Sequence, residues 1–246
     1  MLHWLNRAEL PQHIRSFFRD ARTYEAAHFI QKLIGKCSPV LCVGDEWGRE
    51  YYALTAQGSV VFNLDIAWQP HLPRLTIGDV AHDIPFGDST FDAVILAEVL
   101  EHLFDDARSL REARRVLKDD GLLVVSVPFF NDVPEYHVRL HSAKTVRRLL
   151  EHAGFQITRL VFRGGLISFP RIVGLACRVF DRQTVLNQIA EWDWRWGARN
   201  NWWMRRSQYY GCYLAAKKSE TKDFRALNRD QFSAAATLSR LQPPRG

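Results

Sequence analysis

The sequence predicts an α/β fold built around a parallel β-sheet that helices cover on both faces. Two observations lead to this prediction. Short apolar runs, typical of buried strands, alternate along the chain with segments whose apolar residues recur at helical spacing. A turn that contains Gly44 and Gly48 joins the first of these strands to the following helix, as in doubly wound sheets.

The expected elements follow one another in the order that such a sheet requires. Strands are expected at residues 39–43, 60–65, 75–77, 91–97, 121–127, 155–162 and 209–216. Helices are expected at residues 11–19, 22–34, 47–55, 106–116 and 142–152. Several ends carry a recognisable signal, since Gly35 and Gly58 follow helices and Ser142 precedes one as an N-cap.

The composition bounds the kind of protein. The chain has 246 residues, of which 47% are hydrophobic and 24% charged, which excludes a disordered, collagen-like or coiled-coil protein. It contains no apolar run of about 18 residues that could span a membrane and begins with no apolar signal-peptide core. We therefore expect a cytoplasmic protein, with its four cysteines as reduced thiols because they form neither a Cys-x-x-Cys pair nor a dense framework.

The charge and the tryptophans are concentrated near the carboxyl end. Residues 190–246 contain 11 Lys and Arg against 5 Asp and Glu, which accounts for the whole net charge of +6. Residues 163–206 hold five of the eight tryptophans, interleaved with arginines. Such a segment can be a packed helical pair, a substrate lid, or a surface that contacts lipid headgroups, because Trp and Arg favour a boundary between polar and apolar phases.

The first strand-to-helix turn predicts a nucleoside ligand. Asp65 stands 21 residues after Gly44, at the end of the next strand, where a carboxylate can hold the two hydroxyls of a ribose. The turn itself carries Asp45 and Glu46, which would repel a pyrophosphate. These carboxylates suit the cationic sulfonium and ammonium groups of S-adenosylmethionine instead.

Four further blocks lie in a characteristic order at residues 78–94, 97–103, 115–121 and 126–128. With them the chain resembles the class I S-adenosylmethionine-dependent methyltransferases, in particular the small-molecule methyltransferases, from about residue 37 to 162 and again at the last strand. The resemblance implies a Rossmann-like, seven-stranded, mostly parallel sheet with an antiparallel last strand. It also implies an enzyme that transfers a methyl group.

The resemblance divides the chain into N-terminal helices at 1–36, a methyltransferase domain at 37–217 with an insertion at 163–206, and a polar tail at 218–246. Within the domain, Gly44 and Gly48 would shape the methionine-binding turn, and Asp65 would bind the ribose. Asp79 and Val80 would contact the adenine. The full expected cofactor-binding set is Gly44, Asp45, Glu46, Gly48, Asp65, Ile66, Asp79, Val80 and Ala97.

Two positions depart from the pattern of the resembled group. Cys42 stands where these enzymes usually have an acidic residue, and Glu46 where they usually have a glycine. The missing acid would weaken the hold on the ammonium group, while Glu46 would either crowd the cofactor or replace part of the lost charge. A binding module that has lost cofactor affinity is therefore one alternative function.

Acidic and imidazole side chains follow the fourth strand. Glu98, Glu101 and His102 are spaced to converge at the start of a helix, and with His137 they resemble the metal site of O-methyltransferases that act on ubiquinone precursors or on the 3′ end of small RNAs. These four residues are the expected ligands of a Mg²⁺ ion. The same pattern also occurs without metal, in which case the catalytic residues would be His102, His137 and Glu101, with a histidine as general base.

These observations predict O-methylation of a small or lipid-linked acceptor by direct displacement, with S-adenosylmethionine as cofactor and peripheral contact with a membrane as one option. A second alternative is an RNA methyltransferase that holds its substrate with the basic Trp/Arg segment. The neutral charge of the first 189 residues counts against it, because a strand-binding enzyme usually has a basic channel beside its active site.

Overall fold

The computed structural model describes residues 12, 20–129, 135–199 and 210–219. Its seven strands form one sheet in the order β3-β2-β1-β4-β5-β7-β6. The strands are β1 (Val40–Val43), β2 (Val61–Asp65), β3 (Leu75–Ile77), β4 (Phe91–Ala97), β5 (Leu117–Pro128), β6 (Phe155–Arg163) and β7 (Gly211–Lys218). The first five strands in this order, from β3 through β2, β1 and β4 to β5, pair in parallel. Strand β7 is antiparallel to both β5 and β6. The predicted fold class is confirmed.

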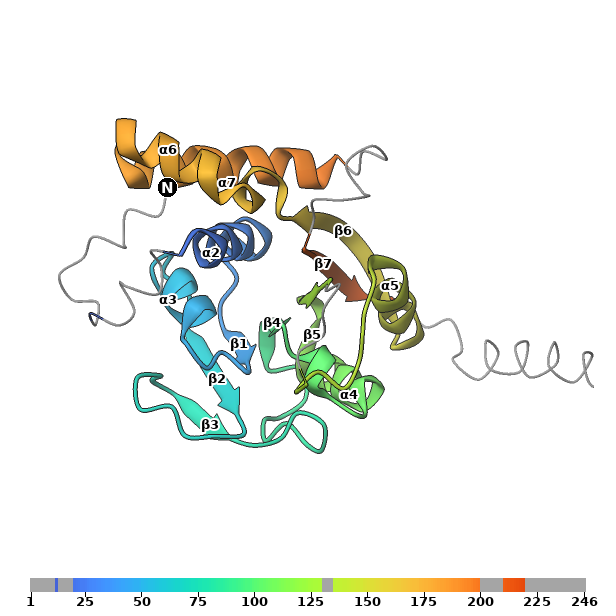
Figure 1. Ribbon diagram of the computed structural model, residues 1–246. Helices are drawn as coiled ribbons and strands as arrows, with labels where there is room; N and C mark the ends of the chain where they lie inside the picture. Colours follow the sequence, from blue (N-terminus) through green and yellow to red (C-terminus); the bar gives the residue numbers. More distant parts are fainter. Residues whose placement is uncertain (1–11, 13–19, 130–134, 200–209, 220–246) are drawn as a thin grey trace, which may run out of the picture.

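Helices cover both faces of this sheet, with α4 and α5 on one side and α2 with α7 on the other (Figure 1). The helical elements are α2 (Ala21–Ile34), α3 (Arg49–Thr55), η2 (Leu100–His102), α4 (Asp106–Val116), α5 (Ala143–His152), η3 (Gly165–Ser168), α6 (Pro170–Val179) and α7 (Arg182–Ala198). The helix expected at residues 11–19 lies outside the described residues. No helix in the described part of the chain is long and apolar enough to cross a membrane.

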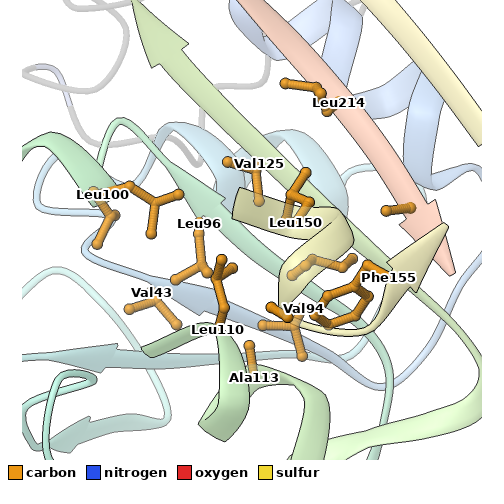
Figure 2. Close-up of a cluster of buried hydrophobic side chains, with 14 of the residues drawn as sticks. Val43, Val94, Leu96, Leu100, Leu110, Ala113, Val125, Leu150, Phe155 and Leu214 are labelled. Carbon is orange, nitrogen blue, oxygen red and sulfur yellow. The ribbon is translucent and has the colours of Figure 1, made fainter. Parts of the chain in front are cut away.

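The alternation of side chains along the strands explains the two layers. In β1, Leu41 and Val43 belong to the apolar cluster beneath α4 and α5, while Val40 and Cys42 belong to the cluster beneath α2. Figure 2 shows the first cluster, where side chains of β4 and β5 lie against α4 and α5. All four of these β1 residues are buried, as expected for a strand covered on both faces.

Between β6 and β7, residues 170–198 contain the helices α6 and α7, which lie side by side next to α2 (Figure 1). Asp193 of α7 accepts hydrogen bonds from the backbone N–H groups of Leu166 (2.7 Å) and Ile167 (2.9 Å) in η3. Gly197 passes so close to β6 that an added Cβ would lie 2.1 Å from the carbonyl oxygen of Phe162. The insertion is therefore tied to the sheet rather than attached by its ends alone.

Candidate active site

A cavity of about 720 Å³ lies at the carboxyl ends of β1, β2 and β4. This is the edge at which doubly wound sheets bind ligands, because the loops that follow parallel strands meet there. The cavity has the size of a pocket for a small molecule or cofactor. Seven of the nine predicted cofactor-binding residues line it, whereas Asp45 and Gly48 do not.

The turn after β1 is shaped by two glycines in the left-handed region. Gly44 has φ +67°, and a Cβ atom added to it would lie 2.9 Å from Cγ2 of Val99. Gly48 has φ +75° and stands as the residue before α3. Neither position suits a side chain, and of this turn Gly44, Glu46 and Trp47 line the cavity.

The two acidic residues of this turn point in different directions. Glu46 is exposed and lines the cavity, whereas Asp45 is buried, and its carboxyl group accepts a hydrogen bond of 2.7 Å from the backbone N–H of Tyr51. Burial, followed by the nearby charge of Glu50, raises the pKa of Asp45 well above its usual range. Asp45 thus binds the first turn of α3 and does not line the cavity, so the charge argument made from the sequence applies to Glu46 alone.

The residues after β2 and β3 offer hydrogen-bonding groups to the same cavity. Asp65 ends β2, and its Oδ1 accepts a hydrogen bond of 2.9 Å from the backbone N–H of Ala67. Ile66 is 76% exposed beside it. Asp79 is held in the same way, since its Oδ1 accepts from the backbone N–H of Ala81 at 2.8 Å. Both carboxylates are therefore fixed at the cavity edge before any ligand arrives.

Two arginines converge on one carboxylate at the end of β4. Glu98 has φ +59° and forms ion pairs with Arg163 and, at 3.7 Å, with Arg49. Burial alone would raise the pKa of Glu98, but the two guanidinium groups outweigh it and hold the pKa at about 2. Arg49 also contacts Glu50 at 2.6 Å, so charges of opposite sign alternate along this wall of the cavity.

Through Arg163 this charge network extends to Glu25 of α2. The guanidinium of Arg163, only 3% exposed in its side chain, lies 4.7 Å from the ring centre of Tyr210 and 5.3 Å from that of Tyr213. The hydroxyl of Tyr210 donates to Glu25, whose other oxygen accepts from the backbone N–H of Gly164 at 3.0 Å. Burial raises the pKa of Glu25 to about 7, although Arg163 acts in the opposite direction.

Glu101, His102 and His137 form a second cluster in the cavity. One ligand atom from each lies within 4.8 Å of the others, and the two imidazole rings meet edge to face with their centres 4.8 Å apart. The backbone N–H of Val138 donates to the carbonyl of Glu101 at 2.9 Å, which holds the segment of His137 over η2. The structure thus brings together three of the four predicted metal ligands.

Glu98 does not join that cluster, because its carboxylate is engaged by Arg163 and Arg49. Glu101 is 1% exposed, and burial raises its pKa to about 8. Desolvation lowers the pKa of His137 below 6.5, and the neighbouring His102 acts in the same direction. At neutral pH the cluster therefore contains a protonated carboxyl group and a neutral imidazole of His137, a pair suited to proton transfer.

Sequence reasoning missed several residues of this site. Arg49 and Glu50 follow the glycine turn directly, and their position at the start of a helix beside it was the available signal. Glu25, Arg163 and Tyr210 had no such signal, because they lie far apart in the chain and meet only through the order of the strands. Cys42 is fully buried beneath α2, and it does not line the cavity.

Comparison with known proteins finds methyltransferases both by sequence and by fold. Residues 41–125 match a protein family described as a methyltransferase domain. A probable S-adenosylmethionine-dependent methyltransferase of Mycobacterium tuberculosis strain H37Rv is 30% identical over 168 residues, which is 61% of this chain and 60% of the relative. A ubiquinone/menaquinone biosynthesis C-methyltransferase of Haemophilus ducreyi is 27% identical over 37% of this chain and 48% of that protein. The chain thus spans about 60% of the length of the mycobacterial relative.

Solved structures resemble this one in fold. An S-adenosylmethionine-dependent methyltransferase from Archaeoglobus fulgidus matches with a TM-score of 0.58 and 15% identity, over 81% of this chain and 94% of that one. The 1,6-didemethyltoxoflavin-N1-methyltransferase of Burkholderia thailandensis, solved with S-adenosylhomocysteine, matches with a TM-score of 0.55 and 15% identity over 82% and 80%. The resemblance to class I methyltransferases predicted from the sequence is confirmed.

Proposed function

We propose that this chain, whose residues 41–125 match a methyltransferase domain, transfers a methyl group from S-adenosylmethionine to an acceptor bound in the cavity. The observation that carries the proposal is the cavity itself. It opens at the carboxyl ends of β1, β2 and β4, and Gly44, Asp65 and Ala97 line it. These residues come from three separate strand ends and match, position by position, the pattern of the resembled enzymes.

The residues that line the cavity fit this cofactor. The turn at Gly44 leaves the backbone uncovered where the methionine part would lie, since a Cβ there would collide with Val99. The carboxylate of Asp65 would accept hydrogen bonds from the ribose hydroxyls, and Asp79 with Val80 would contact the adenine. When bound, S-adenosylmethionine would supply an electrophilic methyl group, which passes to the acceptor oxygen as S-adenosylhomocysteine is released.

The acceptor in this proposal is a hydroxyl group of a small or lipid-linked molecule. Its proton would pass to His137, because the lowered pKa of this imidazole leaves it neutral at pH 7. His102, with its ring 4.8 Å away, would accept the proton in turn or orient the acceptor. Glu101, with a pKa of about 8, would take part as a neutral hydrogen-bond donor rather than as a base.

A Mg²⁺ ion fits this arrangement poorly. Glu98, one of the four predicted ligands, is committed to two arginines, and their positive charges oppose a divalent cation nearby. Glu101 and the two histidines would have to hold the ion without it. We therefore propose that alignment of the acceptor and proton transfer to a histidine, rather than a metal ion, drive the reaction.

Calorimetric titration tests the proposal. S-adenosylmethionine and S-adenosylhomocysteine are titrated into the wild type and into Asp65→Ala, each with and without EDTA. We expect micromolar binding by the wild type, a loss of roughly thirtyfold or more in the variant because two hydrogen bonds to a carboxylate are removed, and no effect of EDTA. An exposed control, Asp88→Ala, should bind as the wild type does.

The other outcomes distinguish the alternatives. A folded wild type that binds neither compound would contradict the proposal and favour a non-catalytic binding module. Binding that weakens with EDTA would revive the metal. RNA binding with a steep dependence on salt concentration would favour the RNA methyltransferase that the basic Trp/Arg segment suggests.

A further inference from the structure

Helix α6 turns a stripe of apolar side chains toward the outside of the molecule. Ile172, Leu175 and Val179 are spaced by three and four residues, so they lie on one face of the helix. They are 58%, 64% and 70% exposed, and Phe180, directly after the helix, is 66% exposed. We call these four side chains the α6 stripe. On the inner side of α6, Val173 is buried against the cluster that contains Tyr24 and Leu186.

Arginines border this stripe. Arg171 and Arg178 are exposed and seven residues apart, so they share one edge of the helix next to the apolar side chains. Helix α6 contains no acidic residue, and Arg182 begins α7. The nearest acidic neighbour in the chain, Asp181, is the N-cap of α7 and accepts hydrogen bonds from Thr184. The surface around the stripe is therefore apolar with a positively charged border.

The neighbouring helix α7 also carries an exposed indole. Trp192 of α7 is 52% exposed and stacks on Trp196, with ring centres 6.3 Å apart and an angle of 13° between the planes. Helices α6 and α7 lie side by side on the outside of α2 (Figure 1). Tryptophan and arginine both favour the layer between water and hydrocarbon, where an apolar body and a polar end can each find their own environment.

We propose that α6 is a docking surface for an anionic lipid bilayer. An amphipathic helix lying parallel to a membrane buries its apolar face just below the headgroups, and basic residues on its border pair with lipid phosphates. The α6 stripe supplies the first part and Arg171 with Arg178 the second. A lipid bilayer suits both parts of this surface. The apolar face would contact acyl chains, and the two arginines on its edge would contact lipid phosphates.

The insertion also fixes this surface relative to the cavity. Arg163 lines the cavity, and the chain then passes through η3 directly into α6. Asp193 holds η3 through the backbone N–H groups of Leu166 and Ile167. Docking through α6 would therefore hold the cavity at a fixed position relative to the bilayer surface. The docking itself goes beyond the proposed function and does not depend on it.

Co-sedimentation with protein-free vesicles tests the proposal. The full chain is mixed with vesicles of phosphatidylcholine alone or with phosphatidylglycerol in equal parts. We expect binding to the mixed vesicles that weakens as salt is added. Leu175→Ser with Val179→Ser should weaken binding roughly tenfold or more, and Arg171→Gln with Arg178→Gln about tenfold.

Matched controls separate docking from general effects. Phe104→Ser removes an apolar side chain that is 81% exposed between η2 and α4, and Arg147→Gln removes an exposed arginine of α5. Both should bind vesicles as the wild type does. Circular dichroism verifies that each variant is folded, and this control holds whether or not the chain binds S-adenosylhomocysteine.

Three results would overturn the proposal. The first is a folded wild type that remains in the supernatant with the mixed vesicles, and the second is a set of α6 variants that sediment as well as the wild type. The third is a dimer in solution that the α6 variants abolish while vesicle binding is absent, which would assign the stripe to a second copy of the chain.

Discussion

The two walls of the cavity are built in different ways. The wall at the ends of β1 and β2 is made by short local motifs, in which Gly44 opens a turn and Asp65 is held by a backbone N–H two residues later. The second wall, where Glu98 follows β4 and Arg163 ends β6, belongs to a network of charges that extends to Glu25 of α2 outside the cavity. The first wall depends on backbone conformation, and the second on the topology of the sheet.

Under the proposed function, the first wall binds the cofactor and the second recognises the acceptor. Backbone groups and fixed carboxylates suit a ligand that never changes, as a cofactor does. Long side chains from distant elements can differ while the fold is retained, which suits the recognition of one acceptor among many. The variants below damage one wall at a time, in order of the expected effect.

The largest effect is expected from Arg163→Met, which removes the centre of the charge network. Glu98 loses its closest partner and Glu25 loses the cation that opposes its raised pKa. Loss of one partner from a buried ion pair lowers the free energy of unfolding by about 3–5 kcal/mol, which urea denaturation measures. Arg147→Met, at an exposed pair with Glu151, should change it by less than about 0.5 kcal/mol. Equal changes in the free energy of unfolding for the two variants would show that the charge network stabilises the fold no more than an exposed ion pair does.

A pH-dependent effect is expected from Glu25→Gln. The folded protein raises the pKa of Glu25 from 4.5 to about 7, so the native state holds this proton more tightly than the unfolded state does. The stability that this group contributes is complete below about pH 4.5 and declines as the pH rises through 7. The glutamine variant should therefore gain up to about 3 kcal/mol relative to the wild type between pH 4.5 and pH 8.

Thermal unfolding across that pH range measures the difference. Glu151→Gln, on the exposed face of α5, provides the control and should run parallel to the wild type. A Glu25→Gln curve that also runs parallel to the wild type would mean that Glu25 keeps an ordinary carboxyl group in the folded protein.

A smaller effect is expected when the first wall is altered by Gly44→Ala. The added Cβ would lie 2.9 Å from Val99 in a backbone with φ +67°, and the resulting shift of the turn should weaken S-adenosylhomocysteine binding roughly tenfold. Gly58→Ala is the matched control, because Gly58 has φ +93° with nothing within 4 Å of an added Cβ. Gly58→Ala should have the same backbone strain but bind S-adenosylhomocysteine as tightly as the wild type does. Equal affinities of the two variants for S-adenosylhomocysteine would show that Gly44 is not part of the binding site.

The smallest effect is expected from Glu46→Gly, which restores the residue type of the resembled enzymes. Because Glu46 is exposed at the rim of the cavity, we expect calorimetry to find its affinity for S-adenosylmethionine within about threefold of the wild type. A gain well beyond that would show that the side chain crowds the cofactor. A loss of similar size would show that its charge holds the ammonium group.

The sequence predicted the fold closely, because strand and helix signals are local. The strands β3 and β4 and the helix α4 have the expected bounds, and the helix expected from residue 47 begins instead at Arg49, since Gly48 precedes it in a left-handed conformation. Strand β5 begins at Leu117 rather than at residue 121, because Leu117 pairs with Phe91 before a register shift.

The site was predictable only in part. Spacing led to Gly44 in the first turn and to Asp65 at the end of the next strand, and both line the cavity. It could not show that Asp45, next to Gly44, is buried. Nor could it show that Glu98 pairs with Arg163, 65 residues later. That contact exists because β6 returns to the edge of the sheet beside β7, which no local pattern encodes.

A crystal structure of the chain with S-adenosylhomocysteine tests the central claim most directly. We expect the ribose hydroxyls within hydrogen-bonding distance of the carboxylate of Asp65, the adenine beside Val80, and the sulfur at the end of β4, facing His137. Electron density for the compound outside this cavity, or none at saturating concentration, would contradict the account.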